Sequence, residues 1–217
     1  MNVLKNYWEL GSRVADIVEH VLALPEPKLI LPTGSTPLSL YKELVNRQLD
    51  WSTTTTFNLD EYVINPNHPQ SYRSFMKKHL FDRIDIYPNN CNFPDRNTQA
   101  YEDIIPEVDL CILGIGSNGH IAFNEPGSSF KSRTRVVDLT EQTIKDNSRF
   151  FDSIDDVPKQ AITMGLGTIM ESKKIILMAS GDDKLNILNV AMNGEVTEDV
   201  PASILQTHNN VEVYYCD

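Results

Sequence analysis

Short, uniformly apolar runs alternate with longer amphipathic segments along this chain, and this alternation constrains the fold more than any other feature. Residues 109–113 read DLCIL and residues 174–179 read KIILMA. Runs of this length and composition are typical of strands that are buried on both faces. Strands that alternate with helices favour a mostly parallel sheet with helices on both of its faces. We therefore predict an α/β fold built on a single doubly wound sheet.

The same patterns place the individual elements. We expect helices at residues 6–22, 37–46, 70–82, 141–149, 182–193 and 201–207. We expect strands at residues 28–31, 53–59, 109–113, 135–139, 161–164, 174–179 and 211–215. The sequence has no internal repeat, low-complexity segment or long linker. We therefore predict one domain over residues 1–217, with a lid around residues 140–158.

Composition excludes several classes of function. The chain has a net charge of -11, and its 19 basic residues form no stripe, which argues against binding nucleic acid. No apolar run approaches the ~20 residues that span a membrane, and the N-terminus does not resemble a signal peptide. The three cysteines are too few and too scattered to predict disulfides. The five histidines lack the HxH or HxxxH spacing of metal ligands, so no metal site is predicted. We expect a cytoplasmic protein.

In a Rossmann-like, doubly wound sheet, ligands bind beyond the carboxyl ends of the strands. Three polar loops follow predicted strands here, at residues 32–36, 58–62 and 114–126. The fold should bring these loops to one edge of the sheet. The net negative charge would repel an anionic ligand at long range, so a phosphate site there must use local donors.

The first loop, LPTGSTP, is suited to binding phosphate. Gly34 allows close approach of the backbone, Thr36 is a candidate N-cap, and Pro37 suits the first position of a helix. Free N–H groups at a helix N-terminus favour an anion. An ordinary capped helix start explains the same residues equally well.

The other two loops carry residues that can transfer protons. In TTTTFNLDEYV the predicted strand ends at two adjacent carboxylates, and either Asp60 or Glu61 could act as a general base or cap the next turn. LGIGSNGHIAFNEPGSSF presents Asn118, His120 and Glu125 within eight residues. An acidic neighbour would hold the imidazole in one tautomer and stabilise its protonated form. A tight turn that bonds to its own backbone is the alternative.

Six segments, taken in order, resemble the glucosamine-6-phosphate deaminase family in its short form. They read PTGSTPLSLYKEL, FNLDEYV, GIGSNGHIAFNEPGSSF, NSRFF, VPKQAITMGLGTIM and PASILQTH. The pair FNLDEYV and GHIAFNEPG is highly specific. Related 6-phosphogluconolactonases usually follow the glycine–histidine pair with a sequence that lacks NEP.

The resemblance implies hydrolytic deamination of D-glucosamine 6-phosphate to D-fructose 6-phosphate and ammonia, without a cofactor or metal. Asp60 would move a proton between C2 and C1, and His120, paired with Glu125, would open the sugar ring. Asn118 falls where many members have Asp, so only Glu125 would supply a negative charge beside His120, and the pH dependence is expected to differ.

The resemblance also assigns the phosphate contacts and the partners. Gly34, Ser35, Thr36, Arg149 and Lys184 would bind the substrate phosphate. The expected partner is a small sugar phosphate, and we expect a monomer or a small homo-oligomer that binds neither nucleic acid nor membrane. A 6-phosphogluconolactonase-like hydrolase and a non-catalytic sugar-phosphate sensor are the alternatives. Asp60 argues against the first and the His120–Glu125 pair against the second.

The run SRTRVVDL bears on regulation by analogy with larger, hexameric relatives. Those relatives bind N-acetylglucosamine 6-phosphate between subunits, partly through basic residues after the NEP loop and a C-terminal extension. Here Arg133 and Arg135 are present, but Val137 stands where those relatives have a lysine, and the sequence ends at Asp217. We expect no activation by this effector and a hyperbolic dependence of rate on substrate.

Overall fold

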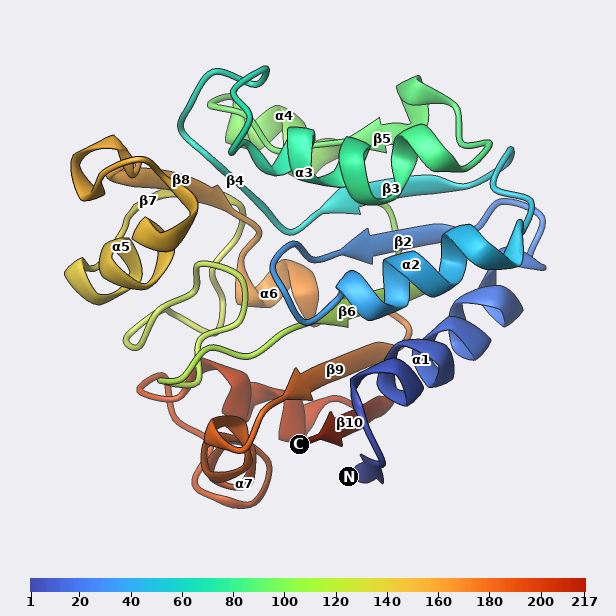
Figure 1. Ribbon diagram of the computed structural model, residues 1–217. Helices are drawn as coiled ribbons and strands as arrows, with labels where there is room; N and C mark the ends of the chain where they lie inside the picture. The colour runs from blue at the N-terminus through green and yellow to red at the C-terminus, as the bar shows by residue number, and fades with distance from the viewer.

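A computed structural model describes residues 1–217, except for the side chain of Asp146. In the part of the chain that it describes, seven strands form a central sheet in the order β1-β10-β9-β6-β2-β3-β5 (Figure 1). Each strand is parallel to its neighbours. The strands are β1 (Asn2–Leu4), β2 (Lys28–Leu31), β3 (Thr55–Asn58), β5 (Cys91–Asn92), β6 (Leu110–Leu113), β9 (Ile175–Ser180) and β10 (Val211–Cys216).

Helices cover both faces of this sheet (Figure 1). Residues of α1 (Tyr7–Leu22), α2 (Leu38–Arg47) and α3 (Tyr72–His79) pack in one core, and residues of α4 (Thr98–Ile104), α6 (Leu166–Ile169) and α7 (Asp183–Asn193) pack in the other. In β6, Leu110 and Ile112 enter the first core while Cys111 and Leu113 enter the second. Apolar side chains on both faces explain the continuous apolar run. The doubly wound, mostly parallel fold is confirmed.

A second, antiparallel sheet was not expected from the sequence. It contains β4 (Asp60–Tyr62), β8 (Gln160–Thr163) and β7 (Arg135–Asp138), paired in that order. The prediction of a single sheet is wrong in this respect. Only Leu59 separates β3 from β4, so the chain leaves one sheet and enters the other within one residue. The local pattern gives no sign of this change, because β4 is as buried as β3.

Helical segments also differ from the predicted bounds. The predicted helix at 70–82 divides into α3 and the 3₁₀ helix Phe81–Arg83, and Pro201–Thr207 is a 3₁₀ helix. The segment predicted at 141–149 divides into α5 (Glu141–Asn147) and the 3₁₀ helix Ser148–Phe150. Two more 3₁₀ helices are Pro88–Asn90 and Ile154–Asp156. None of the described helices is both long and apolar enough to cross a membrane.

Candidate active site

Parallel strands bring the polar loops to one edge of the central sheet. The strands β3, β2, β6 and β9 are consecutive neighbours, and residues 59–62, 32–36, 114–126 and 181–184 follow their carboxyl ends. The chain passes from β2 to β3 in one direction and from β6 to β9 in the other, so the order switches between β2 and β6. In Figure 1 the arrowheads of β2, β3 and β9 point toward the side that carries β7, β8 and α5. A crevice at such a switch is where ligands bind in this architecture.

Asp60 is a buried carboxyl group at the start of β4. Its side chain is only 7% exposed, and its Oδ1 has no hydrogen-bond partner within the described part of the chain. Burial raises the pKa of Asp60 to about 8, with a further contribution from the negative charge of Glu61. A carboxyl group with such a pKa can take up and release a proton near neutral pH.

Glu61, next to Asp60, has a different role. Its Oε1 accepts hydrogen bonds from the backbone amides of Tyr62 and Tyr72 at 2.9 and 2.8 Å, and its Oε2 accepts one from the Arg73 amide at 2.8 Å. Tyr72 and Arg73 begin α3, so Glu61 satisfies amides that the helix leaves unpaired. The sequence left two roles open for these two acids. In the structure Glu61 accepts hydrogen bonds from the first amides of α3, while Asp60 Oδ1 has no partner among the described residues.

Asn118, His120 and Glu125 lie in contact with one another. Asn118 Nδ2 donates to Glu125 Oε2 at 2.8 Å, and Asn118 Oδ1 lies 2.6 Å from His120 Nδ1. Glu125 Oε2 is 3.4 Å from the same ring nitrogen. A Cβ at Gly116 would lie 2.1 Å from His120 Cε1, so only glycine leaves room for the imidazole. The compact turn and the acid–base cluster are therefore the same structure.

The surroundings of Glu125 hold it in the ionised form. Burial alone would raise its pKa, but the hydrogen bond and positive charge of His120, with hydrogen bonds from Thr143 and Asn118, lower the pKa of Glu125 to about 2. Thr143 in α5 donates from Oγ1 to Glu125 Oε1. Glu125 therefore joins the segment around residues 140–158 to His120.

Sequence reasoning missed Thr143. Thr140 caps α5 by accepting a hydrogen bond from the Thr143 amide at 3.1 Å, so the sequence T-x-x-T predicts a helix start. Nothing in that pattern predicts a contact with a residue 18 positions earlier.

An aromatic cluster was also missed. Tyr72 stacks on Phe123 with ring centroids 6.0 Å apart, and Tyr62 contacts Tyr72 at 4.7 Å and Phe151 at 5.8 Å. Tyr62 and Phe123 each lie two positions from Asp60 or Glu125 in the sequence, and this closeness is the available signal. Phe151 lies in the motif NSRFF. The cluster connects Phe151, beyond α5, with β4.

The loop after β2 offers unpaired amides. Gly34 has a φ of +100°, and within the described residues the amides of Gly34, Ser35 and Thr36 have no hydrogen-bond acceptor. Thr36 is not the N-cap that the sequence predicts. The helix α2 begins at Leu38, Pro37 occupies the cap position, and no side chain caps it. The amides of Gly34, Ser35 and Thr36, just before the start of α2, are therefore the ones available to an anion.

The two predicted cations differ in their placement. Lys184 is partly buried after β9, where its Nζ lies 3.8 Å from the exposed carboxylate of Asp183. Arg149 is exposed, and its guanidinium lies 4.7 Å from the ring centroid of Phe150. Among the described residues, Arg149 makes no hydrogen bond with the loop 32–36.

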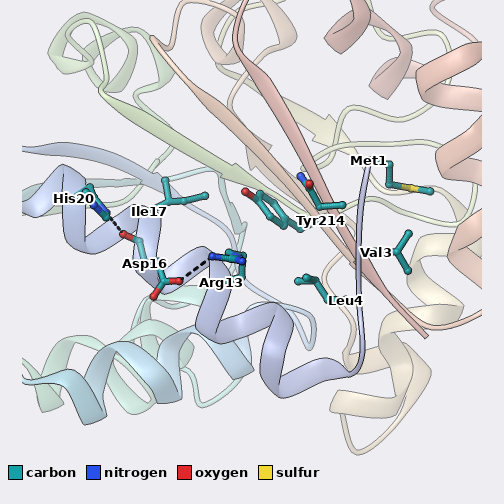
Figure 2. Close-up of a pocket in the computed structure, with 9 residues that line it drawn as sticks. Met1, Val3, Leu4, Arg13, Asp16, Ile17, His20 and Tyr214 are labelled. Atoms are coloured by element: carbon teal, nitrogen blue, oxygen red, sulfur yellow. Dashed lines mark hydrogen bonds and ion pairs between the residues drawn. The ribbon is translucent and has the colours of Figure 1, made fainter.

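A depression elsewhere in the structure lacks the residues that the sequence predicts for a site. It has a volume of about 580 Å³ and lies between β1 and α1 at the outer edge of the sheet, lined by Arg13, Asp16, His20 and Tyr214 among others (Figure 2). No residue of the three polar loops lines it. In the described part of the chain, no group of three His, Cys, Asp or Glu side chains is arranged to hold a metal ion. The edge at β2, β3 and β6 is therefore the candidate active site.

Comparison with known proteins identifies relatives over nearly the whole chain. The family described as "Glucosamine-6-phosphate isomerases/6-phosphogluconolactonase" matches residues 9–214. Glucosamine-6-phosphate deaminase of Mycoplasma mycoides subsp. mycoides SC is 47% identical, over 97% of this chain and 92% of that protein. Glucosamine-6-phosphate deaminase 2 of Bacillus subtilis is 48% identical, over 97% and 92%.

Solved structures show the same relationship. One described as a monomeric glucosamine-6-phosphate deaminase has a TM-score of 0.95 and 40% identity, and the match covers 100% of this chain and 97% of that one. A 6-phosphogluconolactonase from Thermotoga maritima has a TM-score of 0.79 at 20% identity, over 99% and 97%. The second likeness concerns the fold alone.

Proposed function

Because the chain belongs to the family of glucosamine-6-phosphate isomerases and 6-phosphogluconolactonases, we infer that it is a glucosamine-6-phosphate deaminase. It converts D-glucosamine 6-phosphate and water to D-fructose 6-phosphate and ammonia, a step of amino-sugar catabolism. The observation that carries this function is Asp60, a buried carboxyl group without a hydrogen-bond partner for Oδ1 among the described residues. Isomerisation needs such a group to move a proton between two carbons.

Ring opening is the first step that we assign to the loop after β6. His120 takes the proton from the C1 hydroxyl and delivers a proton to the ring oxygen, so that the C1–O bond opens to an aldehyde. Glu125 faces the imidazole at 3.4 Å and stabilises the protonated ring. Asn118 fixes the orientation of both groups, since its amide contacts each of them. A positioned acid–base group contributes roughly 10²- to 10⁴-fold in rate.

Asp60 then acts on the open chain. The aldehyde acidifies the C2 proton, and the ionised carboxylate of Asp60 removes it. Return of that proton to C1, with transfer of a second proton from the amine nitrogen to O1, converts the aldehyde to a hydroxymethyl group and leaves an imine at C2. Water adds to C2, the C–N bond breaks with protonation of nitrogen, and ammonia leaves with fructose 6-phosphate as product. These residue roles require no metal or cofactor, as the sequence predicts.

The phosphate of the substrate supplies the anchor for both steps. We assign its contacts to the unpaired amides of Gly34, Ser35 and Thr36, to Lys184 and to Arg149. Arg149 would reach it by movement of the segment at residues 140–158, which we propose is a lid. A chain of net charge -11 needs these local donors.

The remaining expectations follow from the relatives and the sequence. One solved relative is described as monomeric, which supports a monomer or small homo-oligomer. A single domain over residues 1–217 and a cytoplasmic location stay predictions of the sequence.

Two assays test the function against its alternatives. Purified protein is incubated with glucosamine 6-phosphate, and ammonia and fructose 6-phosphate are measured; the two should appear in equal amounts. The same protein should not hydrolyse 6-phosphogluconolactone faster than the spontaneous reaction. Lactone hydrolysis without ammonia release would identify a lactonase, and binding of the amino sugar phosphate without turnover would identify a sensor.

A further inference from the structure

We propose that Tyr7 is a positioning residue for phosphate binding, because its hydroxyl fixes the orientation of the peptide between Ser35 and Thr36. The proposal rests on the proposed function and adds a residue outside the three polar loops. Tyr7 is the first residue of α1 and lies nearly thirty positions before the loop that it contacts.

The hydroxyl of Tyr7 makes two hydrogen bonds to the backbone around this loop. It donates to the carbonyl oxygen of Ser35 at 2.5 Å and accepts from the amide of Ser39 at 3.0 Å. The Ser35 carbonyl also accepts from the Leu38 amide at 3.2 Å. Two donors therefore hold this carbonyl on the side of α1 and α2.

The direction of the carbonyl determines the direction of the next amide. In a trans peptide the C=O and N–H bonds lie in one plane and point in opposite directions. With the Ser35 carbonyl held toward α1 and α2, the Thr36 N–H points away from them, where no acceptor meets it among the described residues. A peptide flip would instead turn a carbonyl oxygen toward the phosphate.

Close packing between α1 and α2 places the Tyr7 hydroxyl accurately. Gly11 lies one turn after Tyr7 on the same face of α1, and a Cβ there would come within 2.4 Å of the Ser39 carbonyl carbon. Asn6 fixes the start of α1 by accepting hydrogen bonds from the amides of Trp8 and Glu9, both at 3.0 Å. Tyr7 therefore belongs to a helix, α1, whose first turn is capped and which packs directly against α2.

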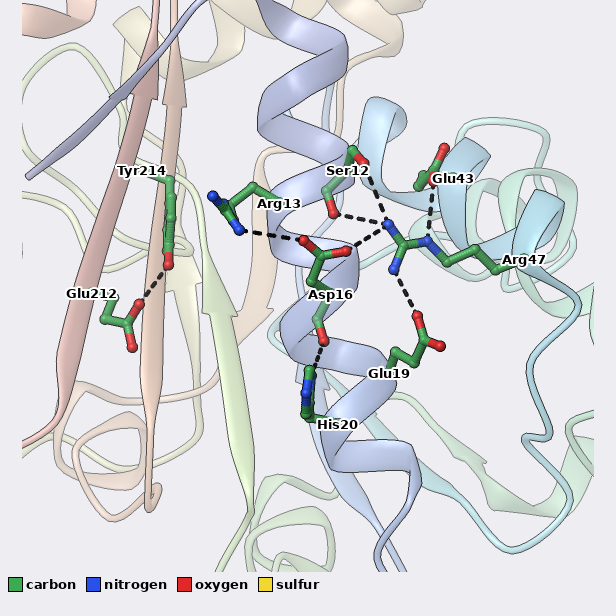
Figure 3. A network of polar contacts seen from close by, with 9 residues as sticks. All are labelled: Ser12, Arg13, Asp16, Glu19, His20, Glu43, Arg47, Glu212 and Tyr214. Atoms are coloured by element: carbon green, nitrogen blue, oxygen red, sulfur yellow. Dashed lines mark hydrogen bonds and ion pairs between the residues drawn. The ribbon is translucent and has the colours of Figure 1, made fainter.

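Ion pairs hold α1 and α2 together near their C-terminal ends. Arg47, the last residue of α2, contacts Asp16 at 2.9 Å and Glu19 at 2.7 Å on α1, and Glu43 at 3.0 Å on its own helix (Figure 3). Arg47 Nη2 also donates to the Ser12 carbonyl oxygen at 3.1 Å. With Gly11 between these ends, α1 and α2 form a rigid support for the loop.

The test is Tyr7→Phe, which removes the hydroxyl and keeps the ring. Both hydrogen bonds of the hydroxyl are lost, but the Leu38 amide still holds the Ser35 carbonyl. The KM for glucosamine 6-phosphate should therefore rise about three- to tenfold, while kcat stays within about twofold. The dissociation constant of inorganic phosphate, measured by calorimetry, should rise by the same factor. Tyr87→Phe is the matched control, since Tyr87 is 61% exposed and its hydroxyl has no partner among the described residues. It should change neither constant.

Three results would overturn the proposal. They are an unchanged KM and phosphate affinity, a fall in kcat at constant KM, or an equal loss of affinity for unphosphorylated glucosamine. A thermal melt of each variant checks folding, and Tyr7→Phe should melt within a few degrees of the parent. Phosphate titration needs no turnover. It therefore tests the role of Tyr7 in phosphate binding even if the parent protein releases no ammonia and the proposed function fails.

Discussion

Asp60 and Glu125 are carboxyl groups at the same edge of one sheet, yet their surroundings are opposite. Glu125 has Asn118, Thr143 and His120 around its two oxygens, and its pKa falls to about 2. Asp60 has an oxygen with no partner in the described residues, and its pKa rises to about 8. Burial opposes ionisation in both places, so the donors around each group decide which form is stable.

The difference has a local cause in the chain. The amides at the N-terminus of α3 donate to Glu61, and no donor meets Oδ1 of Asp60 among the described residues. In the loop after β6, side chains supply the donors, and one of them comes from α5. One carboxyl group is therefore suited to exchanging a proton and the other to holding a permanent charge. The predictions below test that contrast.

Asp60→Asn should have the largest effect. We expect kcat to fall by about 10³-fold or more, because the amide cannot accept the C2 proton. The folded-state pKa of Asp60 lies above its unfolded value near 3.9, so its contribution to stability is present below that value and is lost as pH rises toward 8. At pH 7 the variant should therefore be more stable by about 2–4 kcal/mol in urea unfolding. Substantial ammonia release, or lower stability at pH 7, would contradict this reading of Asp60.

Glu125→Gln should also impair catalysis but shift stability in the opposite direction. We expect kcat to fall about 10²-fold, because His120 loses its negative partner. The pKa of Glu125 is depressed below its unfolded value near 4.3, so its stabilisation is present above that value and is lost as pH falls through about 2. The variant should be less stable by about 1–3 kcal/mol at pH 7 and should match the parent near pH 2. If both substitutions change stability in the same direction, the contrast fails.

Thr143→Val tests whether the segment around α5 acts through Glu125. Valine keeps the shape of threonine and removes the hydroxyl that donates to Glu125 Oε1. We expect kcat to fall about three- to tenfold, with little change in stability, because Asn118 and His120 still contact the other oxygen. Thr143→Ser keeps the donor and should restore most of the rate. Equal losses in both variants would point to packing instead of the hydrogen bond.

The smallest expected effect is that of N-acetylglucosamine 6-phosphate. Arg133 is paired with Glu102 at 2.7 Å and Glu171 at 2.6 Å, and Arg135 donates to Asn124 at 2.9 Å. Both guanidinium groups already bind side chains of this chain, so we expect them to bind a phosphorylated effector weakly. Rate should be hyperbolic in substrate, and the compound should leave it unchanged or inhibit weakly by competition. A sigmoidal curve that becomes hyperbolic on its addition would disprove this.

The parts of the fold that the sequence predicted are those where burial is uniform. Strands such as β6 and β9 were found because apolar residues cover both of their faces. The two-residue strand β5 and the four-residue helix α6 were missed, because elements this short cannot show a hydrophobic periodicity. The second sheet was missed because the chain changes sheets at one apolar residue, Leu59.

The candidate site shows the same limit. The contact of His120 with Glu125 could be anticipated, because the two are five positions apart in a glycine-containing loop. The choice between Asp60 and Glu61 could not, because it depends on where α3 begins. Thr143 and Tyr7 act through contacts across the fold that leave no periodic trace in the sequence. The catalytic and phosphate-binding roles themselves stay predictions.

The edge strand β1 has a consequence for how the chain folds. Asn2 pairs with Tyr214 and Leu4 with Cys216, so the outermost pairing of the sheet joins opposite ends of the sequence. Closing so large a loop costs more conformational entropy than any local pairing and slows folding. Because β1 precedes β10 in the chain, β1 must wait during synthesis until β10 has been made. A circular permutant that joins the two ends, which lie close together in Figure 1, would make this contact local. The permutant should close the sheet faster without altering the candidate active site.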